Sequence, residues 1–128
     1  VNHLALRFPD VDRDAWRTAL RAFAARPQTY VQLSGLPFLY GQQWRSAEAR
    51  SLLDDAFAIL GPQRLMFASD YPMLLRFATY GEWVACVDAF IAAQRMPAVD
   101  VEAIFAGNAL SAHPRLRVRP HVASVEAR

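Results

Sequence analysis

One short apolar segment that ends in a carboxylate constrains the fold of this chain more than any other. Residues 64–73 read RLMFASDYPM, and 65–67 have the length and composition of a buried parallel strand. A Gly-Pro pair at 61–62 ends any helix before it. Asp70 therefore emerges where a strand gives way to a loop, the end at which parallel α/β folds gather catalytic and ligand-binding groups. The alternative is an aspartate that caps its own loop by accepting hydrogen bonds from backbone amides.

The rest of the chain alternates between β-rich and helical segments. Short β-rich runs predict strands at 1–6 and 29–33, and helical periodicity predicts helices at about 13–26, 47–60 and 80–94. No hairpin signal separates the strands, so the order predicts an α/β fold with parallel pairing through right-handed crossovers. About three such units are too few to close a (β/α)8 barrel, which needs about 250 residues. The order alone leaves two folds open, a small open sheet or the last part of a barrel.

Capping residues mark where the three helices begin. Asp10 or Asp12 precedes the first helix, and Ser46 precedes the second. Thr79, followed three residues later by Glu82, forms the pattern of a capping box before the third. These side chains are expected to satisfy the free backbone N–H groups of each first turn.

The remaining segments are predicted to be less regular. Residues 36–45 are expected to form a long aromatic loop. Asp100 is expected to cap a short helix that runs through Phe105 and is closed by Gly107–Asn108. From 111 to 128, arginine alternates with apolar residues and proline without a period, which predicts a solvated, disordered tail.

The composition argues against several classes of function. The chain has 128 residues, of which 54% are apolar, enough for one domain with one core. Its formal charge of +2 is small and scattered, so we expect no nucleic-acid partner. No apolar run approaches the roughly 18 residues of a membrane span. The first residues also lack the pattern of a signal peptide, so we expect no membrane association.

The single cysteine, Cys86, lies inside a helical pattern and is expected to be a buried structural thiol. One thiol cannot form an intrachain disulfide or a thiolate metal cluster, and it fits a reduced compartment, so we expect a cytoplasmic protein. The chain opens on Val1, inside what reads as a strand. That opening suggests an excised or incomplete sequence.

Five motifs occur in a fixed order between residues 1 and 110: NHLAL, YVQLSGL, ILGPQRLMFASDYPM, YGEWV and AIFAGNA. The ordered set resembles the C-terminal half of the amidohydrolase-related proteins of the lactonase type, which include sugar lactonases and the pyrone dicarboxylate lactonase. The resemblance implies that 1–110 form the C-terminal part of a (β/α)8 TIM barrel, an incomplete barrel of about three parallel β/α units, with 111–128 as the tail.

The resemblance also implies roles for two residues. Asp70, the aspartate of an SDWP-like motif, would end the last strand and handle protons, and His3 would project into the same barrel mouth. The sequence departs from the pattern at Asn2 in place of an aspartate, at Leu6 in place of a basic residue, and at Gln32 in place of a lysine. The N-terminal His-x-His pair of such barrels has no counterpart in these residues.

Hydrolysis of a lactone needs an activated water, a polarised carbonyl, and an acid for the leaving oxygen. Asp70 suits the first and third tasks as general base and acid, and His3 could orient or polarise the carbonyl. Arg76 could bind a substrate carboxylate, although a lone loop arginine is more often solvated. Tyr40 and Trp44 could wall the substrate, although aromatic loop residues more often pack on neighbouring loops.

Ser34 and Gly35 follow the predicted strand at 29–33 as a turn of small residues, where backbone can approach a ligand closely. Ser34 lacks a G-x-S-x-G setting and is rejected as a nucleophile. His3 and Asp70 are too few to hold a catalytic zinc, which takes three protein ligands, so we expect no metal bound by this chain alone. The complete barrel would hold either no cofactor or one divalent metal such as zinc, with these two residues as ligands.

Three functions stay open from the sequence. The leading hypothesis is a hydrolase that opens the cyclic ester of a sugar acid or dicarboxylate, a small-molecule substrate, with this chain inactive alone. The second is a metal-dependent decarboxylase or amidase of the same superfamily, and the third is a non-catalytic α/β remnant. The oligomeric state is not predicted.

Overall fold

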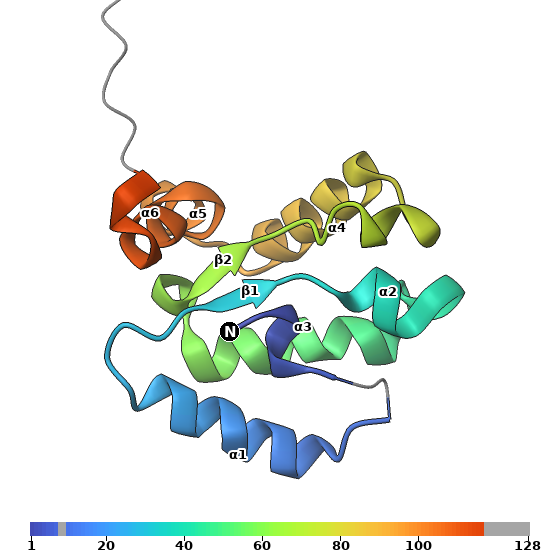
Figure 1. Cartoon of the computed structure of the whole chain (residues 1–128), viewed down its shortest axis with the longest axis horizontal. Helices are drawn as coiled ribbons and strands as arrows, with labels where there is room; N and C mark the ends of the chain where they lie inside the picture. The colour runs from blue at the N-terminus through green and yellow to red at the C-terminus, as the bar shows by residue number, and fades with distance from the viewer. Residues whose placement is uncertain (8–9, 117–128) are drawn as a thin grey trace, which may run out of the picture.

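The computed structural model describes residues 1–7 and 10–116. Its centre is a two-stranded parallel sheet of β1 (Val31–Leu33) and β2 (Leu65–Phe67), drawn in Figure 1 as arrows that point the same way. The pairing runs from Val31 opposite Leu65 to Leu33 opposite Phe67. The α/β class, the two strands and their parallel pairing are therefore confirmed.

Helices cover the strands on both sides. In Figure 1, α1 (Arg13–Ala24) and α3 (Ala47–Leu60) lie on one side and α4 (Tyr80–Ala93) lies on the other, with α5 (Ala98–Glu102) and α6 (Asn108–Ala112). Helix α2 (Leu36–Tyr40) follows β1. Shorter 3-10 turns span His3–Ala5, Gly41–Gln43, Pro62–Arg64, Met73–Arg76 and Pro114–Leu116. No described helix is long and apolar enough to span a bilayer.

The three long helices begin at the predicted capping residues. The side chain of Asp12 accepts hydrogen bonds from two backbone N–H groups of α1, and the side chain of Ser46 accepts one from α3. Thr79 and Glu82 form the reciprocal capping box of α4. The backbone N–H of Thr79 and the guanidinium of Arg45 lower the pKa of Glu82 to about 2.

Helices α1 and α3 are joined by ion pairs. Arg13 donates to Asp55 at 2.7 Å, and Arg17 donates to both carboxylate oxygens of Asp55 at 3.0 and 3.1 Å. Partial burial would raise the pKa of Asp55, but the hydrogen bonds from the two guanidinium groups outweigh it and lower that pKa below its usual value. The pairs hold α1 against α3, on the side of the strands shown lowest in Figure 1.

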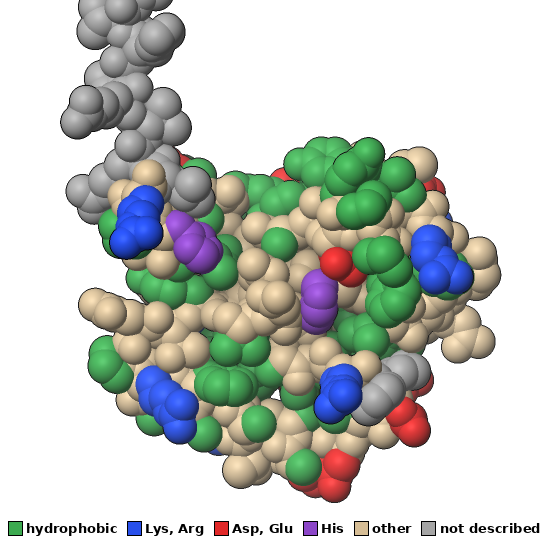
Figure 2. Space-filling view, in the orientation of Figure 1, with side chains coloured by type: hydrophobic (Ala, Val, Ile, Leu, Met, Phe, Trp, Pro, Cys, Tyr) green, Lys and Arg blue, Asp and Glu red, His purple; other side chains and the backbone are tan. Residues whose placement is uncertain are grey.

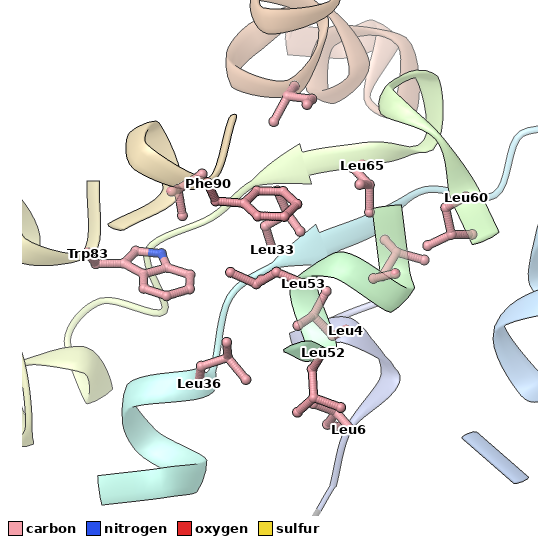
Figure 3. Close-up of a cluster of buried hydrophobic side chains, with 14 of the residues drawn as sticks. Leu4, Leu6, Leu33, Leu36, Leu52, Leu53, Leu60, Leu65, Trp83 and Phe90 are labelled. Atoms are coloured by element: carbon pink, nitrogen blue, oxygen red, sulfur yellow. The ribbon is translucent and has the colours of Figure 1, made fainter. Parts of the chain in front are cut away.

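The apolar core lies between the strands and the long helices. Side chains from the first turn, both strands, α3 and α4 meet there, as Figure 3 shows for Leu4, Leu33, Leu53, Leu65, Trp83 and Phe90. All six are almost completely buried. Burying one large apolar side chain stabilises the fold by roughly 1.5–3 kcal/mol. Because the helices bury their apolar faces in this core, the spacing of apolar residues predicted where the helices lie.

The strand predicted over 1–6 is wrong. The first residue does hydrogen-bond alongside β1, but residues 3–5 have φ angles of 51°, 54° and 60° and form a 3-10 turn. This left-handed region costs about 1–2 kcal/mol for each residue with a Cβ. Tertiary contacts offset the cost, because Leu4 is fully buried and its carbonyl accepts the indole N–H of Trp16 at 2.8 Å. No local pattern contains those contacts.

Two other expectations need correction. The aromatic loop predicted over 36–45 contains α2 and a 3-10 turn, because Pro37 lies in the first helical turn, where its fixed φ and missing N–H cost nothing. At the other end, Pro97 rather than Asp100 occupies the cap position of α5. The tail predicted over 111–128 falls largely on residues outside the described part of the chain.

Gly107–Asn108 does not close a helix as predicted. The chain passes through a π-helical turn, Ala103–Gly107, directly into α6. Asn108 is buried, and its side-chain amide donates to the carbonyl oxygens of Pro62 and Leu65, both at 2.7 Å. The asparagine therefore satisfies backbone at the start of β2 instead of ending a helix.

Candidate active site

His3 and Asp70 lie next to each other, although they are far apart in sequence. His3 Nε2 is 3.8 Å from Asp70 Oδ1, and the two side chains are 37% and 17% exposed. The distance is within ion-pair range and too long for a direct hydrogen bond. Figure 2 shows an imidazole beside a carboxylate on the face turned to the viewer, with apolar side chains flanking them. Both groups are accessible to a water molecule or a small ligand.

Backbone geometry directs Asp70 away from its own turn. The residue follows β2 with a φ of 58°, a left-handed conformation that aspartate tolerates better than most residues. The hydroxyl of Ser69 accepts a hydrogen bond from Tyr71 N at 3.3 Å. Ser69, and not Asp70, therefore caps this loop. The carboxylate of Asp70 faces His3 instead.

Ser34 and Gly35 fix the position of the His3 side chain by direct contact with it. His3 Nδ1 is 2.9 Å from the hydroxyl oxygen of Ser34, which is fully buried at the end of β1. Gly35 has a φ of 85°, and a Cβ added there would lie 2.8 Å from the Cβ of His3. This role was not predicted from the sequence. The turn of small residues after the strand did indicate that a group approaches the backbone closely. That group is the imidazole of His3, which lies against Gly35.

The hydrogen-bonding groups on either side of the His3 ring favour one position for its proton. An ionised carboxylate accepts hydrogen bonds only, so the edge of His3 that faces Asp70 is favoured as N–H. In the neutral ring, Nδ1 then accepts a hydrogen bond from the hydroxyl of Ser34, and in the imidazolium it donates one to the same oxygen. In both states Nε2 is a donor on the side of the ring that faces Asp70.

Replacing Gly35 with alanine is expected to destabilise the fold by at least about 2 kcal/mol and to displace His3. The left-handed φ alone costs about 1–2 kcal/mol, and the clash with the imidazole adds to it. The measurement is urea unfolding together with the NMR shifts of the His3 ring. Gly81→Ala is the control, because Gly81 has no positive φ and its added Cβ would meet nothing within 4 Å. Unchanged ring shifts of His3 in Gly35→Ala would contradict close packing of His3 on Gly35.

The other three candidates have different environments. Trp44 is buried in the core and packs edge-on against Trp83 at 6.0 Å between ring centroids. Tyr40 is half-buried, and burial, followed by the nearby Glu48 carboxylate, raises its pKa. Arg76 is exposed, with its guanidinium 5.9 Å from the ring of Phe77. The structure brings together His3 and Asp70, and substrate contacts by the other three stay predictions.

A zinc ion would find two suitable donors here. Imidazole nitrogen and carboxylate oxygen are both zinc ligands, and two ligands at about 2.0–2.1 Å from one tetrahedral ion lie about 3.4 Å apart. The 3.8 Å between His3 Nε2 and Asp70 Oδ1 is longer than that spacing. Within residues 1–7 and 10–116, no group of three or more His, Cys, Asp or Glu could hold a metal. This chain's described residues therefore fit zinc in donor type but not in number, and the two donors lie slightly too far apart for tetrahedral zinc.

Comparison with known proteins identifies the family. The model of the amidohydrolase family matches residues 2–112. The L-fucono-1,5-lactonase of Burkholderia multivorans is 38% identical in an alignment of length 112 that covers 78% of this chain and 37% of that protein. The chain thus spans well under half the length of this relative.

Solved structures agree with the match. A Burkholderia multivorans amidohydrolase with bound zinc is 34% identical with a TM-score of 0.70, over 85% of this chain and 41% of that one. A candidate 2-pyrone-4,6-dicarboxylic acid hydrolase from Pseudomonas putida is 22% identical with a TM-score of 0.64, over 87% and 41% of the two chains, and this likeness shows the fold alone. The resemblance inferred from the five motifs is confirmed: this chain belongs to the amidohydrolase family.

Proposed function

We propose that the complete protein is a hydrolase that opens a sugar-acid lactone, with Asp70 as general base and acid. The observation that carries this proposal is the placement of His3 beside Asp70 after β2, in a chain similar to an L-fucono-1,5-lactonase. The donor edge of His3 and the acceptor carboxylate form a complementary pair. Lactone opening requires one proton acceptor and one hydrogen-bond donor at the reacting carbonyl.

The proposed chemistry uses one water molecule. The Asp70 carboxylate accepts a proton as the water oxygen bonds to the lactone carbonyl carbon. The N–H at His3 Nε2 donates a hydrogen bond to the carbonyl oxygen, on which negative charge develops. The ring C–O bond then breaks, and Asp70 returns the proton to the leaving oxygen. The product is the open hydroxy acid, and the buried Ser34 keeps the imidazole aimed throughout.

We further propose that this chain is the C-terminal part of a (β/α)8 barrel and is inactive alone. It spans about two fifths of its relatives, and its sheet has two strands. Large apolar side chains just beyond Asp70 are open to solvent, with Tyr71 67% exposed. The others in this group are Met73, Leu75 and Tyr80. The remainder of a barrel would cover such a surface and supply the missing walls of the substrate site.

A second candidate, a metal-dependent decarboxylase or amidase of the same superfamily, is favoured by the zinc in the Burkholderia relative. When bound, zinc acts as a Lewis acid on a carbonyl oxygen and lowers the pKa of a bound water. In that case His3 and Asp70 would supply two ligands, and further ligands would come from outside the described residues. Metal dependence separates this candidate from a metal-free lactonase.

A chimera tests the proposed function. The segment of the Burkholderia lactonase that matches this chain is replaced by the chain, and acid release from L-fucono-1,5-lactone is followed at constant pH. We expect the chimera to open the lactone and the 128-residue chain alone to be inert. A chimera with native circular dichroism but no turnover would contradict the lactonase proposal and favour the non-catalytic remnant. Activity of the chain alone would contradict its incompleteness. Loss of lactone opening on chelation would contradict a metal-free mechanism and leave the lactonase activity itself in place.

A further inference from the structure

A pocket lies away from His3 and Asp70, between α3 and α4. Its volume is about 330 Å³, at the small end of the range of about 300–1,000 Å³ that is typical of ligand sites. Leu36, Trp44 and Leu53 form much of its apolar wall. Neither His3 nor Asp70 lines it. The lining residues come from α2, α3, α4 and the segment between α2 and α3.

The two arginines at this pocket are in different electrostatic states. Arg45 donates to Glu82 at 2.6 Å and stacks over the ring of Trp44 at 4.4 Å, so its charge is compensated. Arg50 is exposed on α3, and among the described residues no carboxylate or hydrogen-bond acceptor holds its guanidinium. The pocket therefore combines an apolar interior with one uncompensated positive charge at its edge.

The other ionisable groups at the pocket, Cys86 and Glu82, leave its net charge positive. Cys86 is half-buried in the pocket wall, and burial raises the pKa of its thiol. The thiol is therefore neutral at physiological pH and presents a weak S–H donor. Glu82 is ionised but is already bonded by Arg45 and by Thr79. The net charge offered to a ligand comes from Arg50.

We propose that this pocket binds a small carboxylate with an aromatic or branched apolar body. The apolar part would lie against Trp44 and Leu53, and the carboxylate would pair with the guanidinium of Arg50. An uncharged apolar ligand would leave Arg50 unused, and a larger anion would exceed the volume of about 330 Å³. Leu36 in the wall directly follows Gly35, on which His3 packs, so occupancy also contacts the segment that positions the imidazole.

The experiment is an NMR titration of the isotope-labelled 128-residue chain, run in parallel on the chimera. The probe is 3-phenylpropionate, and 3-phenylpropanamide has nearly the same shape without the charge. We expect saturable shifts at the indole N–H of Trp44, with the amide binding about threefold to fivefold more weakly, as for an exposed ion pair. Ala85→Trp is expected to fill the pocket and abolish binding, because Ala85 lies at its exposed edge.

Charge variants complete the test. Arg50→Gln should lower the affinity for 3-phenylpropionate to that for 3-phenylpropanamide. Arg21→Gln, on the exposed face of α1, should leave both affinities unchanged. The proposal is overturned if no saturable shift appears at Trp44 in either protein. It is also overturned if Arg50→Gln leaves the affinity of the carboxylate unchanged. Because Asp70 does not line the pocket, these outcomes are independent of lactone turnover.

Discussion

Asp70→Asn is expected to lower kcat/KM for lactone opening by the chimera by about 10²–10⁴-fold. Positioned proton transfer contributes a factor of that order, and an amide cannot accept the proton of water at neutral pH. The substitution is nearly isosteric, and asparagine tolerates the φ of 58° that Asp70 adopts. We therefore expect the free energy of unfolding to change by less than about 1 kcal/mol.

Kinetics over a range of pH distinguishes a catalytic role from a structural one. Loss of the general base should remove the acidic limb of the kcat/KM profile, which a positioning role would leave in place. Asp88→Asn is the matched control, since Asp88 is an exposed aspartate on α4. Unchanged turnover in Asp70→Asn, with native stability, would remove Asp70 from the mechanism.

Local chemistry explains why the long helices could be predicted from sequence. Each of α1, α3 and α4 has its own capping side chain and its own apolar stripe, so the information lies within about fifteen residues. The strand before Asp70 was equally legible, because a Gly-Pro pair isolates it from α3. The Thr79–Glu82 pair predicted a capping box, and the structure contains both of its hydrogen bonds.

Contacts between distant residues explain what the sequence could not provide. The left-handed turn at 3–5 depends on burial of Leu4 and on the indole of Trp16, and neither appears in a local pattern. The local pattern predicted that Asn108 ends a helix, because asparagine commonly follows helices. Its side-chain amide instead donates hydrogen bonds to the carbonyl oxygens of Pro62 and Leu65, far earlier in the chain. In both places a tertiary hydrogen bond outweighs the local preference.

The candidate site was predictable in part for the same reason. Parallel strands place their carboxyl ends at one edge, which made Asp70 a candidate before any relative was considered. His3 was a candidate through the family resemblance, and the structure brings its ring to Asp70. Ser34 could not be assigned, because its role is to bind that ring across thirty-one positions of sequence. Trp44 reads as a loop residue, and its burial depends on Trp83 in another helix.

Trp83→Ala is expected to destabilise the chain by about 3–5 kcal/mol, the largest stability effect of any substitution considered. The side chain is fully buried, packs edge-on against Trp44, and donates its indole N–H to the carbonyl of Ala68 at 2.9 Å. Removing a buried aromatic ring loses its apolar burial and leaves a cavity. Urea unfolding followed by circular dichroism measures the loss, in the chimera if the chain alone does not unfold cooperatively.

Trp83→Phe separates packing from the hydrogen bond. Most of the ring volume remains, but the carbonyl of Ala68 loses its donor, which costs about 1–2 kcal/mol. Trp16→Phe is the matched control, because the indole of Trp16 is also buried and donates to a backbone carbonyl, that of Leu4. Since Ala68 lies two residues before Asp70, Trp83→Phe should perturb the NMR shifts of Asp70 more than those of the turn at 3–5, and Trp16→Phe should do the reverse. A loss below about 1 kcal/mol in Trp83→Ala would contradict the close packing of the Trp83 ring in the core.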